Sequence, residues 1–183
     1  MYLKLNIALI GPRGAGKSKI SRKLTKIIGN PVVSTDMIAV YESGGHSIEE
    51  QIREANGDWK NFRDLEFRIL EKISEAKNII LDCGGGIIFD VNDLGEEIVS
   101  ERKVRLLKSF AKIIFVYQSK ENLLQKVKND SNRPTLSQIN SYEEILNRRM
   151  PVYSKIADLQ LNLDGKKPEE AASEILQLLK GKF

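Results

Sequence analysis

The chain has little of several residue types: one cysteine, one histidine, one tryptophan and five prolines among 183 residues. Its single cysteine, Cys83, cannot form an internal disulfide and is typical of a reducing compartment. The only histidine, His46, lies in a Gly-Gly-His loop, where an exposed residue is expected rather than a base. Long hydrophobic runs are also missing, since the longest, such as Ile7 to Ile10, are far shorter than the roughly 20 residues that cross a bilayer. With no secretory signal in view, we expect a cytoplasmic protein without membrane contact.

Strong charge of one sign is absent as well. Lysine and arginine number 29 against 25 aspartates and glutamates, which gives a net charge of +4, and the two signs are interspersed. This pattern is typical of a solvated, mixed surface. Because no Cys-x-x-Cys pair, aromatic ribonucleoprotein signature or basic stripe is present, we expect no nucleic-acid partner, while anionic small molecules remain open as ligands.

Strand-like and helix-like apolar patterns alternate along the chain. Residues 3–10 form a nearly continuous apolar strand, and a helical pattern follows from Lys17 to Ile28, where Gly29 can end it. Further strands are expected at residues 31–33, 78–82, 111–117 and 158–163. Helices are expected at residues 47–57, 58–76, from 119, at 141–150 and at 168–180, with one or two more between 86 and 111. The alternation predicts an α/β fold in three α/β/α layers, with a five-stranded parallel sheet in one domain, residues 1–183.

One segment stands apart from this alternation. Residues 130–140 are polar and contain Asn132, Pro134 and two serines, a composition that predicts a mobile loop between two helices. We interpret this loop as a candidate lid. Its Arg133 could fold over a phosphoryl group and offset its charge, or it could simply be solvated.

The residues from Gly11 to Ser18 read Gly-Pro-Arg-Gly-Ala-Gly-Lys-Ser and match the pattern G-x-x-x-x-G-K-[ST] at every fixed position. They lie between a buried strand and an amphipathic helix, the context in which this motif binds phosphate. Backbone N–H groups of Gly14, Ala15 and Gly16 would surround phosphate oxygens. Lys17 would reach the β- and γ-phosphates, and the Ser18 hydroxyl would face Mg²⁺. The sequence therefore predicts a nucleoside triphosphate site.

Two aspartates follow predicted strands at the sheet edge where ligands bind in α/β proteins. Asp36 could accept the proton of an attacking hydroxyl, or it could cap a helix that begins near Met37. Asp82 ends an apolar run, as a Walker B aspartate does, and is a second candidate ligand of Mg²⁺ beside Ser18. Its alternative is a turn residue.

The other candidates each have a structural alternative. Gly84, Gly85 and Gly86 allow the backbone to approach a ligand, although a plain turn would use them equally well. Arg63, with Glu66 three residues on, could form a surface ion pair. Arg149 precedes the expected end of a helix, where it could cap carbonyls.

Taken in order, these segments resemble the shikimate kinases over most of the chain. Only the phosphate-binding loop is specific by itself, and the joint occurrence of the others in the same order carries the likeness. The segments are the loop at Gly11 to Ser18, Ser-Thr-Asp at Ser34 to Asp36, Gly-Asp-Trp-Lys-Asn-Phe-Arg-Asp-Leu-Glu at Gly57 to Glu66, the triple glycine, Arg-Pro at Arg133, and Arg-Met-Pro-Val-Tyr at Arg149 to Tyr153.

The resemblance implies that the protein uses MgATP to phosphorylate the 3-hydroxyl of shikimate, a cyclic trihydroxy carboxylic acid on the path to chorismate and the aromatic amino acids. We expect it to be a monomer. It implies that Asp36 receives or orients the hydroxyl proton while Lys17 stabilises the developing charge. Arg63, oriented by Glu66, and Arg149 would hold the substrate carboxylate, a task suited to planar guanidinium groups. The backbone of the triple glycine would contact the ring hydroxyls, and Arg133 would close with the lid onto the phosphates.

The chain departs from the family at the metal site. The family usually carries Asp-x-Asp after the second strand, and Ser34 stands here in place of the first aspartate. Asp82 could compensate for this exchange. A lesser departure is Asp58, where glutamate often follows the glycine.

Two other classes of function remain open from the sequence. One is a related small-molecule kinase of the gluconate or nucleotide type, since Arg63 with Arg149 favours an acid without naming it. The other is a nucleotide-binding regulatory module without turnover, which Ser34 would suit. A GTPase is disfavoured because the guanine-binding Asn-Lys-x-Asp is missing after the fourth predicted strand.

Overall fold

The computed structural model describes residues 4–128 and 141–180. The candidate lid with Arg133 and Pro134 lies outside these described residues. The central feature is a five-stranded sheet in the order β2-β3-β1-β6-β7, and all of its neighbouring strands are parallel. Its strands are β1 (Ile7–Ile10), β2 (Val32–Ser34), β3 (Ile80–Asp82), β6 (Lys112–Tyr117) and β7 (Leu159–Asn162). The expected α/β fold with five parallel strands is therefore confirmed.

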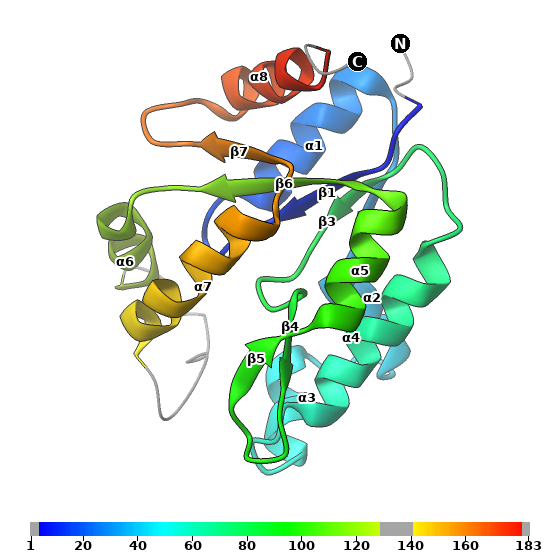
Figure 1. Cartoon of the computed structure of the whole chain (residues 1–183), viewed down its shortest axis with the longest axis vertical. Coiled ribbons are helices and arrows are strands. Elements are labelled where there is room, and N and C mark those ends of the chain that lie inside the picture. Colours follow the sequence, from blue (N-terminus) through cyan, green and yellow to red (C-terminus); the bar gives the residue numbers. More distant parts are fainter. Residues whose placement is uncertain (1–3, 129–140, 181–183) are drawn as a thin grey trace.

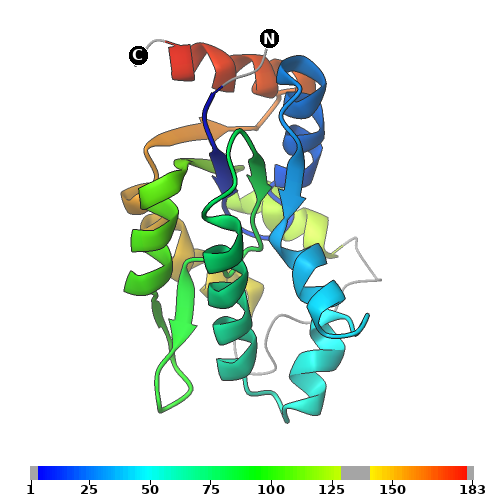
Figure 2. The ribbon, with the colours of Figure 1, turned by 90° about the vertical axis from the view of Figure 1, so that its right-hand side faces the viewer.

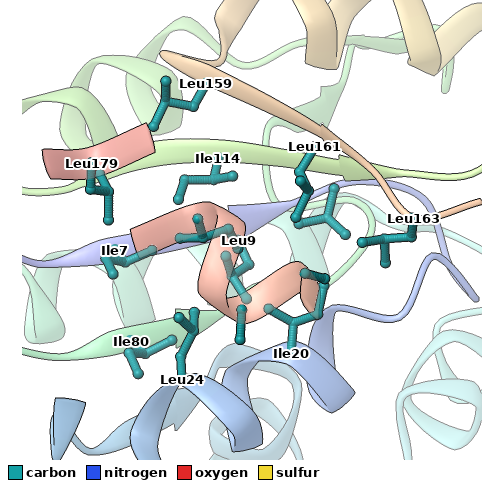
Figure 3. Packing of buried hydrophobic residues seen from close by; sticks show 14 of the residues in the cluster. Ile7, Leu9, Ile20, Leu24, Ile80, Ile114, Leu159, Leu161, Leu163 and Leu179 are labelled. Atoms are coloured by element: carbon teal, nitrogen blue, oxygen red, sulfur yellow. The ribbon is translucent and has the colours of Figure 1, made fainter. Parts of the chain in front are cut away.

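Two helices cover one face of the sheet (Figure 1). They are α1 (Lys17–Ile28) and α8 (Pro168–Lys180). Figure 3 shows Ile20 and Leu24 of α1 and Leu179 of α8 packed against side chains from the strands. Every side chain labelled in that view is buried, so burial of apolar surface fixes these helices to the sheet.

Helices α4 (Lys60–Ile73), α5 (Glu101–Phe110) and α7 (Tyr142–Ile156) contribute to the core on the opposite face. Helices α2 (Thr35–Glu42), α3 (Ile48–Glu54) and α4 form a smaller apolar cluster. Ser47 and Ser141 each begin a helix with a reciprocal capping box, as their sequences predicted. Helix α6 (Lys120–Lys128) follows β6.

The segment after the triple glycine differs from the expectation of one or two helices. It forms an antiparallel hairpin of β4 (Phe89–Val91) and β5 (Glu97–Val99), followed by one helix, α5. The Asn92 side chain closes the hairpin turn by accepting hydrogen bonds from the backbone N–H groups of Leu94 and Glu96. Each strand has only three residues, which is too short for an alternating pattern to stand out. In Figure 2 the green hairpin projects away from the sheet beside α4.

Helix α7 also differs from its expected end near residue 150. It continues through Pro151 to Ile156, although proline removes a backbone donor from a helix interior. Tyr153 and Ile156 are buried against the sheet, so tertiary packing outweighs the local cost of the proline. Within the described part of the chain, no helix is long and apolar enough to cross a membrane.

Candidate active site

The loop between β1 and α1 has the predicted strand-loop-helix setting. Gly11 has a φ of +144°, and a Cβ there would lie 2.2 Å from Val116 O, so the strand can turn only with glycine. Gly16 adopts a left-handed conformation with a φ of 104° directly before the first residue of α1. The backbone N–H of Ala15 donates to Pro12 O at 3.2 Å, which tightens the loop.

Lys17 is buried and folded back onto this loop. Its Nζ donates to Gly11 O at 2.9 Å and to Pro12 O at 3.0 Å. Burial lowers the pKa of Lys17, while Asp82 and Asp36 oppose that shift. A phosphate is a stronger acceptor than a backbone carbonyl, so the loop holds a cation ready for a phosphate. Ser18, the next residue of α1, is exposed.

Asp36 lies in the first turn of α2 and is not the cap of that helix. Ser34 is the cap, because its Oγ accepts a hydrogen bond from Met37 N at 3.4 Å. The alternative interpretation of Asp36 as an N-cap is therefore wrong. The Asp36 carboxylate lies against the triple glycine, since a Cβ on Gly84 would be 2.2 Å from Asp36 Oδ1.

The surroundings of Asp36 suit a proton acceptor. Solvent reaches one side of the residue, but the protein around its carboxylate raises the pKa of Asp36 to about 6. Desolvation is the main cause, and the negative charge of Glu66 adds to it, while Lys17 and Arg63 oppose it. A carboxyl group with this pKa is ionised at neutral pH and can take up a proton.

Arg63 is buried inside the molecule and is not a surface residue. Its Nη1 donates to Glu66 Oε2 at 2.9 Å, and its guanidinium lies 4.8 Å from the centroid of the Trp59 ring. A Cβ on Gly86 would be 2.1 Å from Arg63 Nη1, so glycine makes room for the guanidinium. Its Nε is buried and has no hydrogen-bond partner within the described residues. The alternative of a surface ion pair is wrong, because the pair with Glu66 is buried.

Arg149 comes from α7 and reaches the same glycine turn. Its Nη1 donates to Gly85 O at 3.2 Å, and the Tyr153 hydroxyl donates to the same oxygen. Its Nε lies 2.9 Å from Glu97 Oε1, and its Nη2 also bonds the Glu97 carboxylate. Because α7 continues past this position, Arg149 does not cap the end of a helix.

Asp82 and Ser34 are register partners at the ends of the neighbouring strands β3 and β2. Asp82 is 9% exposed, and its charge acts on Lys17 and on Asp36. The same turn is fixed by Thr35, whose buried Oγ1 accepts a hydrogen bond from Gly84 N at 2.8 Å. Asp82 therefore lies beside the phosphate-binding loop, because it is also the register partner of Leu9 in β1.

The structure thus brings most of the candidates to the ends of β1, β2 and β3. Arg133 is the exception, because it lies outside the described residues. Sequence reasoning missed three polar residues here: the buried Thr35 and Lys103, and Glu97, whose side chain is 12% exposed. Lys103 left one signal, a lysine on the otherwise apolar face of an amphipathic helix, whereas Glu97 on its short strand left none.

Comparisons with known proteins agree with this geometry. A family model described as shikimate kinase matches residues 13–180. A shikimate kinase of Leptospira borgpetersenii serovar Hardjo-bovis is 57% identical over 95% of this chain and 97% of its own length. One from Leptospira biflexa is 51% identical over 94% of each chain. A solved shikimate kinase from Acinetobacter baumannii in complex with shikimate has a TM-score of 0.79 at 26% identity, and covers 99% of this chain and 96% of that one.

Proposed function

The chain belongs to the shikimate kinase family, and on this premise we propose that it transfers the γ-phosphoryl group of ATP to the 3-hydroxyl of shikimate. The products are shikimate 3-phosphate and ADP, on the path to chorismate and the aromatic amino acids. The observation that carries this assignment is the position of Asp36. The charges of Lys17 in the phosphate-binding loop and of Arg63 at the acceptor side both act on its carboxylate and lower its pKa.

The donor side is built by the loop before α1. The N–H groups of Gly14, Ala15 and Gly16 would bind phosphate oxygens at the positive end of the helix. Lys17 would exchange its two carbonyl acceptors for phosphate oxygens and stabilise the charge that develops during transfer. By the resemblance, Arg133 of the lid would add a further positive charge.

The acceptor side orients shikimate and receives the proton of its 3-hydroxyl. The guanidinium groups of Arg63 and Arg149 would bind the substrate carboxylate, and the backbone of Gly84 to Gly86 would contact the ring hydroxyls. As the substrate oxygen bonds to the γ-phosphorus, the bond to the bridging oxygen of ADP breaks and ADP leaves with the electron pair. Asp36 takes the hydroxyl proton in this step. Positioning and electrostatics account for most of the catalysis.

Mg²⁺ fits the residues at the donor side. Ser18 offers an exposed hydroxyl, and Asp82 offers a nearly buried carboxylate at the end of β3. Within residues 4–128 and 141–180 no group of three or more acidic, histidine or cysteine side chains forms a metal cage. Mg²⁺ commonly takes most of its ligands from water and nucleotide phosphates, so these two residues are enough. When bound, the ion neutralises charge on the β- and γ-phosphates.

The same proposal includes the cellular setting and the assembly. Cys83, the only cysteine, is buried and reduced, as suits the cytoplasm. The proposal includes a monomer that works as a single domain. The proposal includes no nucleic-acid or membrane partner.

A coupled ADP-release assay tests the proposed function. The purified protein is given MgATP with shikimate, gluconate, quinate, a nucleoside monophosphate or no acceptor, and Lys17→Ala and Asp36→Asn serve as matched inactive variants. We expect turnover that depends on shikimate and is nearly lost in both variants, with the fold intact. Turnover with gluconate or a nucleotide instead would reassign the acceptor. ATP binding without turnover on any acceptor would support a regulatory module.

A further inference from the structure

A carboxylate of the chain itself lies between the two arginines that we assign to the substrate carboxylate. Glu97 accepts hydrogen bonds from Arg149 Nε, at 2.9 Å to Oε1 and 3.1 Å to Oε2, and from Arg149 Nη2. Its Oε2 also lies 4.0 Å from Arg63 Nη2. The free protein therefore satisfies its acceptor arginines with the same chemical group that an acidic substrate would present.

The Nε and Nη2 edge of Arg149 is occupied while Glu97 stays in place. Nε and Nη2 bond Glu97, and Nη1 donates to Gly85 O at 3.2 Å. Arg63 differs, because its buried Nε has no partner within the described residues. A substrate carboxylate can take the Nε and Nη2 fork of Arg149 only if Glu97 leaves.

The charges around the arginines lead to the same conclusion. Glu97 pairs with Arg149, and its Oε1 also lies 3.4 Å from Nη2 of the more exposed Arg148. A substrate carboxylate at Arg149 would bring a second negative charge next to Glu97. Like charges in a desolvated site repel each other, so the exchange of one carboxylate for the other avoids this repulsion.

The hairpin that carries Glu97 is anchored on its β4 side, where Asp90 forms ion pairs. Strand β5 has three residues, and Ile98 and Val99, which follow Glu97, are 44% and 43% exposed. Segments with short, solvent-exposed strands open locally more easily than core strands do. Directly after β5 the chain is fixed to β4, because the buried Ser100 Oγ donates to Asp90 Oδ2 at 2.7 Å. Release of Glu97 therefore needs β5 to shift and needs no change in the five-stranded sheet.

We propose that Glu97 is an internal competitor of the acidic substrate: it holds Arg149 in the free protein and yields the Nε and Nη2 fork to the substrate carboxylate. Glu97 is thus a positioning residue that sets the affinity of the acceptor site without touching the reacting atoms. This inference rests on the proposed function. Its consequence is that hairpin β4–β5 loosens when the acidic acceptor binds.

Steady-state kinetics with Glu97→Gln test the competition. A neutral amide hydrogen-bonds Arg149 about half as strongly as a carboxylate, so KM for shikimate should fall about fivefold or more, with kcat little changed. Glu96→Gln is the matched control, because it removes the same charge one residue away, where the carboxylate bonds Asn92 in the turn. Its KM should equal that of the wild type. An unchanged or raised KM in Glu97→Gln overturns the proposal.

Hydrogen exchange on the wild-type protein provides a test that does not require the variant to fold. Saturating shikimate should speed exchange of the amides of residues 94–99, because the tether to Arg149 is lost. Unchanged or slower exchange would show that Glu97 stays in place, and it overturns the proposal. Wild-type protein without shikimate-dependent turnover overturns the proposed function itself and this inference with it. Normal turnover with an unaltered KM in Glu97→Gln overturns the inference alone.

Discussion

Lys103 Nζ, which is fully buried, lies 3.0 Å from Glu66 Oε2, the same oxygen that accepts a hydrogen bond from Arg63. Lys103 also donates to Phe89 O at 2.8 Å and pairs with Asp90 at 3.0 Å. Lys103 of α5 thereby holds the Glu66 carboxylate of α4, and Glu66 in turn orients Arg63. Glu66 was expected to orient Arg63, and the structure adds Lys103 behind it.

We expect Lys103→Met to destabilise the protein by about 3 kcal/mol or more, because it leaves the buried Glu66 with one partner fewer. The midpoint of urea unfolding measures this loss. Lys108→Met makes the same exchange at an exposed position of α5 and should change stability by less than about 0.5 kcal/mol. Equal stability of the two variants would show that Lys103 does not hold Glu66.

Substitutions at two positions of the triple glycine should cause different kinetic defects. A methyl group on Gly84 would meet the Asp36 carboxylate, and one on Gly86 would meet the Arg63 guanidinium. We expect Gly84→Ala to lower kcat by about 100-fold and Gly86→Ala to raise KM for shikimate by about tenfold. Steady-state kinetics on both variants give the two constants.

The two variants also control for each other. Both add one methyl group to the same turn, and neither glycine has a positive φ, so backbone strain does not arise in either variant. Both groups that would have to move are the ends of side chains, so we expect both variants to fold. The same kinetic defect in both would mean that the turn moves as a whole, contrary to the assignment of separate partners.

Sequence reasoning found the parts of the site that depend on local chemistry. The phosphate-binding loop was visible because Gly11 and Gly16 have backbone requirements that few residues meet. The parallel arrangement of the strands follows from general rules of α/β folds, and it brought Asp36 and Asp82 to one edge. Glu97 and Lys103 could not be placed, because their roles depend on contacts with α7 and α4 that no local pattern records.

Asp36→Asn should make the protein more stable while nearly abolishing turnover. The pKa of Asp36 is raised to about 6, so the folded protein binds this proton more tightly than the unfolded chain does. Ionisation of Asp36 therefore costs stability as the pH rises from about 4 to 6, and the cost persists at pH 7.5. With solvent screening allowed for, we expect a gain of about 1 kcal/mol, or about 2–4 °C in Tm, at pH 7.5.

Thermal unfolding of wild type and Asp36→Asn across pH 4 to 8 measures this difference, which should vanish near pH 4. Glu71→Gln removes an exposed carboxylate from α4 and should leave Tm unchanged. In the wild type, kcat/KM for shikimate should fall below about pH 6, because the proton acceptor becomes protonated. A Tm gain that persists undiminished at pH 4 would assign it to a cause other than the Asp36 charge.

Ser34 and Asp82 are register partners at the ends of β2 and β3, and we expect their roles to differ. The Ser34 hydroxyl accepts a hydrogen bond from Met37 N, so it serves the start of α2, whereas Asp82 is the carboxylate next to Lys17. Asp82→Asn should raise the Mg²⁺ concentration for half-maximal turnover about tenfold or more, since the neutral amide is a poorer ligand of a hard cation. Ser34→Ala should change it less than about twofold.

The unfolding free energy should rank the two variants in the reverse order, with the larger loss in Ser34→Ala. Ser34→Ala removes a helix cap and should cost about 1 kcal/mol in unfolding free energy, which urea denaturation detects even in an inactive protein. Calorimetric titration with ADP, with and without Mg²⁺, gives a second reading of the metal site that does not depend on turnover. If Asp82 holds Mg²⁺, its replacement removes the Mg²⁺-dependent part of ADP binding and Ser34→Ala keeps it. Identical Mg²⁺ titrations for wild type, Asp82→Asn and Ser34→Ala would show that Asp82 does not replace the missing family aspartate.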